Sequence, residues 1–167
     1  IYQKEDLLAL LEQQKHQPDN HISHDELRIV EGALIFGNKL VGDVMTPKRA
    51  VKAVAATDSI GPHLMDELHS SGHSRFPVYQ DKPDNFIGML YARDLIDATD
   101  GGQVRNLMKK KVYYVHEQQS LGQVLQAFLK TKHHLFIVVN EFEEVVGIIT
   151  IEDVLEQAAF EVGSAEE

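Results

Sequence analysis

The order of apolar and polar positions is nearly the same in two stretches of the chain. Residues 135–153 predict an apolar strand, a polar turn, a second apolar strand and a helix that begins at Ile151. Residues 74–94 follow the same order, with Gly88 in the place of Gly147 and a turn one residue longer. A chain that repeats itself in this way predicts two similar supersecondary units.

Apolar positions before each stretch add one strand and one helix to each unit. Short β-branched runs predict the strands, and helical spacing predicts the helices. These are a strand at 51–55, a helix that Asp58 or Ser59 caps and Gly72 ends, a strand at 112–115 and a helix capped by Ser120. The order β-α-β-β-α, twice, predicts an α/β (α+β) fold with two small sheets and helices on one side. Because neither unit buries much surface alone, we expect both to pack as one pseudo-twofold module.

A helical hairpin is predicted ahead of the first unit. Leucines 7, 8, 10 and 11 have helical spacing, and Pro18 lies in the break that follows. Ser23 and Glu26 form a capping box for a second helix, which ends at Gly37-Asn38. Its apolar face is expected to hold Leu27, Val30, Ala33 and Leu34. The expected domains are the hairpin (1–40), the first repeat (41–100), the second repeat (101–160) and a tail (161–167).

Short helices complete the two repeats. One is predicted at 92–98, directly after the first pair of strands. The last runs from Ile151 to about Phe160, with Val154 and Leu155 turned inward.

The charge of the chain limits the classes of molecule that it can bind. The formal net charge of the 167 residues is -10, which argues against nucleic acid, because nucleic-acid binding depends on Lys and Arg at phosphates. The absence of cysteine excludes disulfides and thiolate metal sites. No apolar run reaches the length of a spanning helix. Since the first residue is Ile1 rather than Met, we expect the chain to be a piece of a longer protein.

Thr150 and Asp153 are the first candidates for binding chemistry. A helix that begins at Ile151 offers unpaired N–H groups and the positive end of its dipole. Thr150 at the N-cap can serve the helix or a phosphate, and Asp153 can accept the hydroxyls of a ribose. The alternative is a capped helix with an acid in its first turn.

Arg75 is the second candidate, at the start of the strand Arg75-Phe-Pro-Val78. Its guanidinium can bind phosphate in a forked geometry. The alternative is a surface ion pair, since the chain has 26 Asp and Glu residues.

These motifs resemble a tandem pair of CBS domains. The pattern Gly-x-x-Thr-x-x-Asp (147–153), its imperfect copy ending at Asp94, the run Glu31 to Pro47 with its Met-Thr-Pro, and Ser-Gly-His-Ser-Arg-Phe-Pro-Val (71–78) are similar to the cytosolic part of the CorC/CNNM magnesium and cobalt transporter family. The resemblance covers about residues 23–160. It implies a regulatory module on the cytosolic side of a membrane, attached to a membrane domain of the same full-length chain and forming a homodimer.

The resemblance also implies an adenine-nucleotide site. ATP, ADP or AMP would act as an effector, with Mg²⁺ accompanying the phosphates. The expected ligand-binding residues are Thr46, Ser74, Arg75, Phe76, Pro77, Thr150 and Asp153. His73 stands where relatives often have an aromatic residue. The two repeats are expected to leave two clefts between them. The cleft at the end of the first repeat, residues 88–94, is expected to be empty or poor, because Tyr91 replaces the threonine and Leu135 the arginine.

Catalysis and protein-bound metal are not expected. The chain has no phosphate-binding loop, zinc-protease motif, serine elbow or cysteine nucleophile. The groups His16, His21, His24 and Asp66, His69, His73 each include a helix break. We therefore interpret the first group as surface histidines and do not favour a metal at the second. Two alternatives to a transporter module stay open: a CBS pair that senses AMP or ATP for another protein, and a ligand-free dimerisation scaffold.

Overall fold

The structure is a computed structural model that describes residues 9, 24–96, 98 and 101–164. The predicted first arm of the hairpin, the capping box at Ser23 and the histidines His16 and His21 lie outside the described residues. Among the described residues, no helix combines the length and the apolar character that crossing a membrane requires.

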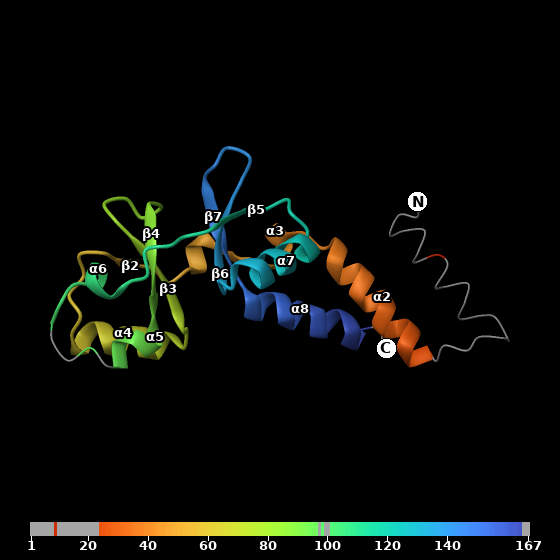
Figure 1. The fold of residues 1–167 in the computed structure, drawn as a ribbon, viewed down its shortest axis with the longest axis horizontal. Helices are drawn as coiled ribbons and strands as arrows, with labels where there is room; N and C mark the ends of the chain where they lie inside the picture. The colour runs from red at the N-terminus through yellow and green to blue at the C-terminus, as the bar shows by residue number, and fades with distance from the viewer. Residues whose placement is uncertain (1–8, 10–23, 97, 99–100, 165–167) are drawn as a thin grey trace. The chain divides into compact units, whose positions relative to one another are not determined.

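Helices and strands follow the predicted order (Figure 1). Their bounds are α2 (His24–Asn38), α3 (Val41–Val44), β1 (Thr46–Pro47), a 3-10 helix (Lys48–Ala50), β2 (Val54–Ala55), α4 (Pro62–Ser71), β3 (Arg75–Tyr79), β4 (Phe86–Tyr91), α5 (Ala92–Ile96), α6 (Val104–Leu107), β5 (Tyr114–His116), α7 (Leu121–Thr131), β6 (Leu135–Val139), β7 (Val145–Thr150) and α8 (Ile151–Ser164). Two sheets form, with the orders β1-β7-β6-β5 and β2-β3-β4. The predicted mixed α/β fold with two small sheets is confirmed.

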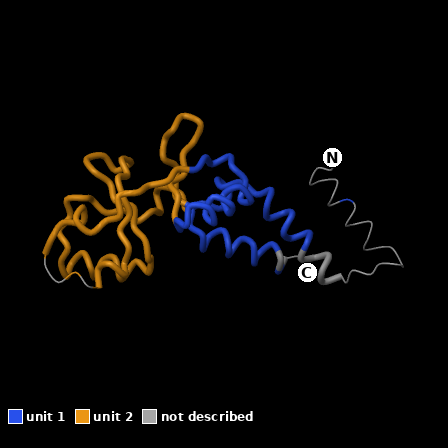
Figure 2. Tube along the Cα trace, viewed as in Figure 1, with its two compact units in different colours: residues 1–45, 115–134, 149–167 blue, residues 46–114, 135–148 orange. Residues whose placement is uncertain are grey.

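Two compact units divide the chain, and they are interleaved in sequence (Figure 2). Unit 1 holds residues 1–45, 115–134 and 149–167. Unit 2 holds residues 46–114 and 135–148.

The three-stranded sheet of unit 2 is apolar on both faces. β2 pairs in parallel with β3, and β3 pairs antiparallel with β4. On one face, Phe76, Val78 and Leu90 are fully buried against Leu64 and Leu68 of α4. Strand periodicity explains this burial, because alternate side chains point to the same face.

The other face of that sheet packs against strands of the second repeat. Phe86 and Met89 form a buried cluster with Leu135, Ile137 and Ile148. The β3-β4 hairpin is therefore covered on both sides within unit 2, which accounts for its continuous apolar sequence.

The start of the second repeat docks on the first repeat. In unit 2, the Val104 N–H donates to the Asp58 carbonyl (2.9 Å), and the main chains of Met89 and Lys109 exchange two hydrogen bonds of 2.8 Å. A Cβ at Gly88 would lie 2.6 Å from the Lys109 carbonyl oxygen and 2.7 Å from the Met108 sulfur. Gly88 is therefore required by the close approach of this segment.

The core of unit 1 is helical. Helix α2 packs against α7 and α8, and α8 also contacts α3 and α7. Phe36, Val41, Leu121, Phe128 and Val154 are buried there. These side chains come from four helices, so the apolar stripe of each helix is used.

The start of the first repeat docks on the second repeat in the same way. In unit 1, the Val41 N–H donates to the Gln119 carbonyl (2.9 Å) and the Gly42 N–H to the Glu117 carbonyl (2.9 Å). Bridges between Leu40 and Ser120, and between Ser59 and Gln103, occupy equivalent places in the two repeats. The first residues of each repeat thus pack against the other repeat.

Several local predictions were wrong. Gly61, not Asp58 or Ser59, is the N-cap of α4, because the Asp58 carboxylate accepts the Ala55 N–H instead (3.1 Å). The strand expected at 51–55 is paired only at Val54–Ala55, and the one expected at 112–115 is β5, Tyr114–His116. Val51 and Ala53 are apolar because they pack on the unit 2 cluster.

Two helix faces also differ from expectation. Leu155 is 54% exposed, whereas Val154 is fully buried. On α2, Val30 and Ala33 are exposed and Phe36 is buried. Gly37 is also buried and packs against α7, where a Cβ on Gly122 would make an ordinary contact of 3.5 Å with the Gly37 carbonyl oxygen.

Candidate functional site

Thr150 and Asp153 form a reciprocal cap at the start of α8. The Asp153 N–H donates to the Thr150 hydroxyl oxygen (3.1 Å), and the Thr150 N–H donates to Asp153 Oδ2 (3.0 Å). The Ile151 N–H is satisfied by the His134 carbonyl (3.0 Å). The predicted N-cap role of Thr150 is therefore confirmed, and it fixes the Asp153 side chain in one orientation.

The cap leaves unused capacity at both side chains. Within the described part of the chain, the structure records no hydrogen bond to Asp153 Oδ1 and none donated by the Thr150 hydroxyl. A carboxylate oxygen can accept hydrogen bonds, and a hydroxyl can donate one. Both side chains are half-buried, so a ligand that reaches them would find one fixed acceptor and one fixed donor.

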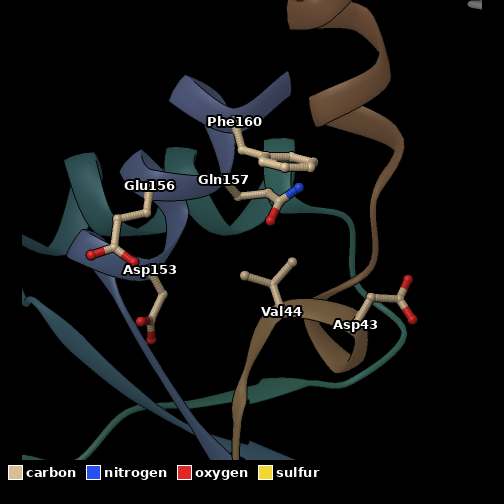
Figure 3. A pocket seen from close by; sticks show the side chains of 6 residues that line it. All are labelled: Asp43, Val44, Asp153, Glu156, Gln157 and Phe160. Carbon is tan, nitrogen blue, oxygen red and sulfur yellow. The ribbon is translucent and has the colours of Figure 1, made fainter. Parts of the chain in front are cut away.

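A cavity of about 410 Å³ lies between α3 and α8 in unit 1 (Figure 3). Its lining residues are Asp43, Val44, Asp153, Glu156, Gln157 and Phe160. Three carboxylates make the lining negative, so the cavity disfavours phosphate and suits groups that donate hydrogen bonds. Phe160 contributes an aromatic ring to this lining (Figure 3).

Sequence reasoning missed five of the six lining residues. On α8, Glu156, Gln157 and Phe160 follow Asp153 by three, four and seven positions, which is the spacing of one helix face. That spacing is a signal that could have identified them. Asp43 and Val44 approach through the docking of α3, and nothing local in the sequence indicates this contact.

Four of the predicted residues stand together in unit 2. Ser74 is exposed, Arg75 is half-buried, and Phe76 and Pro77 are buried. Arg75 pairs with Tyr91 across β3 and β4. The Phe76 side chain belongs to the sheet core, so a ligand would meet its main chain rather than its ring.

The remaining predicted residue, Thr46, lies on β1. It is opposite Ile148 of β7 in an antiparallel pair, and Pro47 is opposite Gly147. The structure thus joins Thr150 with Asp153 in unit 1, and it holds Thr46 and residues 74–77 in unit 2.

The first repeat lacks the cap that distinguishes the second. Tyr91 stands in the place of Thr150, and its ring lies under the Arg93 guanidinium, 4.8 Å from the ring centroid. Asp94 Oδ2 is buried with no hydrogen-bond partner in the described part of the chain. The threonine is therefore what allows the reciprocal arrangement in the second repeat.

Metal binding finds no geometric support in the part of the chain that is described. No group of three or more His, Asp or Glu side chains there is arranged to hold an ion. His73 instead contacts Phe76, edge to face, with ring centroids 6.4 Å apart.

Comparison with known families and proteins adds independent information. The model of the CBS domain matches residues 41–101 and again 104–159. The chain is 33% identical over 139 residues to the magnesium and cobalt efflux protein CorC of Pasteurella multocida, covering 81% of this chain and 46% of that protein. It is 28% identical over 162 residues to CorC of Escherichia coli, covering 95% of this chain and 54% of that protein. The chain thus spans about half the length of these relatives.

Solved structures show the same likeness. A CBS domain of the bacterial CNNM/CorC family Mg²⁺ transporter has a TM-score of 0.79 and 26% identity, over 95% of this chain and 96% of that one. A structure of such a domain in complex with ATP has a TM-score of 0.73 and 27% identity, over 80% and 96%. CBSX2 in complex with AMP has a TM-score of 0.61 and 25% identity, over 74% and 98%.

Proposed function

This chain belongs to the CBS-domain family, and we propose that it is the adenine-nucleotide-binding regulatory module of a magnesium or cobalt transport protein. The observation that carries the proposal is the reciprocal Thr150–Asp153 cap, which leaves one oriented acceptor and one donor at a helix start. The similarity of this chain to a CBS domain solved in complex with ATP supports the choice of ligand.

Each predicted residue has a role in this proposal. Asp153 Oδ1 accepts hydrogen bonds from the ribose hydroxyls, and Thr150 donates to the nucleotide. Arg75 and Ser74 bind the phosphates, because a guanidinium and a hydroxyl are suitable partners for them. Thr46 and the strand at Phe76-Pro77 complete the adenine side. The acidic cavity beside Asp153 is not the phosphate site, since three carboxylates line it.

The wider biology follows from the same proposal. The nucleotide is an effector rather than a substrate, and Mg²⁺ accompanies its phosphates against a chain of net charge -10. Two modules associate as a homodimer on the cytosolic side of the membrane. A nucleotide that binds two dimer arrangements unequally then biases a membrane domain of the same protein.

Titration calorimetry with ATP, with and without Mg²⁺, tests the proposal. We expect binding to the wild-type chain and a loss of at least about tenfold in affinity in a Thr150→Ala, Asp153→Ala double variant. Asp94→Ala at the equivalent position of the first repeat is the matched control and should bind ATP like wild type. Absence of heat and of any thermal shift with ATP, ADP and AMP would favour the ligand-free scaffold.

A sensor of AMP for another protein is the second candidate. The likeness to CBSX2 in complex with AMP favours it. The same titration with AMP distinguishes the two, because a transporter module selective for ATP should bind AMP more weakly, whereas an AMP sensor should show the reverse order.

A further inference from the structure

Glu161, in the last turns of α8, is the one charged side chain that is buried among the residues whose exposure is described, at 7% exposed. Its Oε1 accepts from Lys39 Nζ (3.1 Å) and from Gln157 Nε2 (2.9 Å). Lys39 follows the last residue of α2, so this ion pair ties the end of α2 to the end of α8. A buried charge is tolerated only when it is paired, so removal of the Lys39 cation beside the buried Glu161 carboxylate should weaken the packing of the end of α2 on α8.

Main-chain bonds reinforce the same junction. The Lys39 carbonyl accepts the Leu121 N–H at 2.8 Å, next to the bonds of Val41 and Gly42 to the loop before α7. A Cβ at Gly42 would lie 3.3 Å from the Glu117 carbonyl oxygen, so the approach is close. The segment from Lys39 to Gly42 is therefore held on the second repeat by side chain and main chain together.

Helix α8 connects this junction to the Thr150–Asp153 cap. Asp153, Gln157 and Glu161 succeed one another at four-residue intervals, so they lie on one face of a single 14-residue helix. Eight residues of helix span about 12 Å. Gln157 contributes to both sites, because it lines the cavity beside Asp153 and donates to Glu161.

From these contacts we propose that the Lys39–Glu161 ion pair is a latch that couples the docking of α2 to ligand binding at the start of α8. The proposal rests on the nucleotide-binding function proposed above. Val44 lies in α3, the helix that this docked segment begins, and lines the cavity beside Asp153, which is assigned to the nucleotide. Docking of α2 and α3 therefore favours nucleotide binding, and by linkage nucleotide binding favours docking. Through α2, the binding of nucleotide therefore influences the part of the chain that precedes this helix.

Hydrogen exchange and calorimetry on the 167-residue chain test the latch. In Glu161→Gln without nucleotide, we expect the amides of residues 30–44 to exchange at least about fivefold faster than in wild type, while circular dichroism stays unchanged. The affinity for ATP should fall by a similar factor. Lys39→Met should reproduce both effects, and Lys39→Arg should reproduce neither. In wild type, ATP should slow exchange in the same segment.

Lys48→Met is the matched control, because it removes an exposed ion pair with Asp84 (2.6 Å) that lies in unit 2, whereas the Lys39–Glu161 pair lies in unit 1. It should change neither exchange in residues 30–44 nor ATP affinity. Unchanged exchange in Glu161→Gln would overturn the latch. Faster exchange with unchanged ATP affinity would overturn the coupling. If the wild-type chain binds no ATP, both the proposed function and the coupling to ligand binding are wrong. The hydrogen exchange of the variants without nucleotide then still tests whether the Lys39–Glu161 pair holds α2 in place.

Discussion

Gly88 shows how much a single missing side chain contributes to this fold. An added Cβ would meet the Lys109 carbonyl oxygen at 2.6 Å and the Met108 sulfur at 2.7 Å. Because the main chain of Lys109 is held by two bonds to Met89, it cannot move aside cheaply. We expect Gly88→Ala to lower the free energy of unfolding by about 1–3 kcal/mol, measured by urea denaturation.

Gly61→Ala is the control for that substitution. No atom lies within 4 Å of the added Cβ, and the backbone at Gly61 is extended. Because Gly61 is the N-cap of α4, the substitution should lower the free energy of unfolding by only about 0.5 kcal/mol, less than Gly88→Ala. Equal losses in the two variants would show that the contact with segment 108–109 does not determine the need for glycine.

Two neighbouring apolar residues on α8 differ in how deeply they are buried. Val154 is fully buried, and Leu155 is 54% exposed. Val154→Ala should cost roughly 2 kcal/mol of stability, because it leaves a gap in a packed core, while Leu155→Ala should cost little. Chemical denaturation of both variants measures this difference. A larger loss for Leu155→Ala would contradict the described packing, unless a partner covers Leu155 in solution, which a change of melting temperature with protein concentration would reveal.

The sequence could not distinguish these two residues. Both are apolar and adjacent, and helical periodicity places either one on the inner face within the uncertainty of one position. The reciprocal Thr150–Asp153 cap, in contrast, was predictable because it depends on residues three apart at a helix start.

The structure explains why the pKa of Glu67 is lowered. The hydrogen bond from Lys52 and the positive charge of Lys52 lower the pKa of Glu67 below its ordinary value. A lowered folded-state pKa stabilises the fold above the ordinary value, and this contribution is lost as pH falls through the lowered value. Lys52→Met should therefore raise the pKa of Glu67 toward its ordinary value in an NMR titration. Lys48→Met should leave it unchanged, and a shift there would indicate a longer-range effect of charge.

At the scale of elements, α4 and α7 occupy equivalent places but begin differently. The Ser120 hydroxyl accepts the Gln123 N–H (3.2 Å), and Gln123 Oε1 accepts the Ser120 N–H (3.1 Å). Helix α4 instead begins after Gly61 with Pro62 in its first turn and has no side-chain cap. We expect Ser120→Ala to cost about 1 kcal/mol in thermal or urea unfolding. Ser59→Ala, at the equivalent position, should cost much less, and similar losses would contradict the difference in capping.

The elements that periodicity predicts best are the two hairpins. β3, β4, β6 and β7 begin and end where alternation, turns and glycines place them. The short strands β2 and β5 were misplaced by one to three residues, because burial rather than pairing makes residues such as Val51 and Ala53 apolar. An apolar run alone cannot separate the two causes.

At the scale of the whole molecule, the sequence did not predict that the first residues of each repeat pack against the other repeat. Residues 102–109 dock on the first repeat in unit 2, and residues 39–42 dock on the second repeat in unit 1. Both sets of contacts join residues far apart along the chain, and local propensity carries no information about them. This packing means that a repeat defined by sequence lacks one part of its own core.

Separation of the chain between Gly101 and Gly102 tests this consequence. Residues 24–101 would lose Val104, which is fully buried in the unit 2 core, and residues 102–164 would lose Val41, which is fully buried in unit 1. Each fragment would also leave main-chain groups of the docking loops unpaired. We therefore expect neither fragment to unfold cooperatively on heating, as followed by circular dichroism, and an equimolar mixture to recover a cooperative transition. A cooperative transition in either fragment alone would mean that a repeat can complete its core without the first residues of the other repeat.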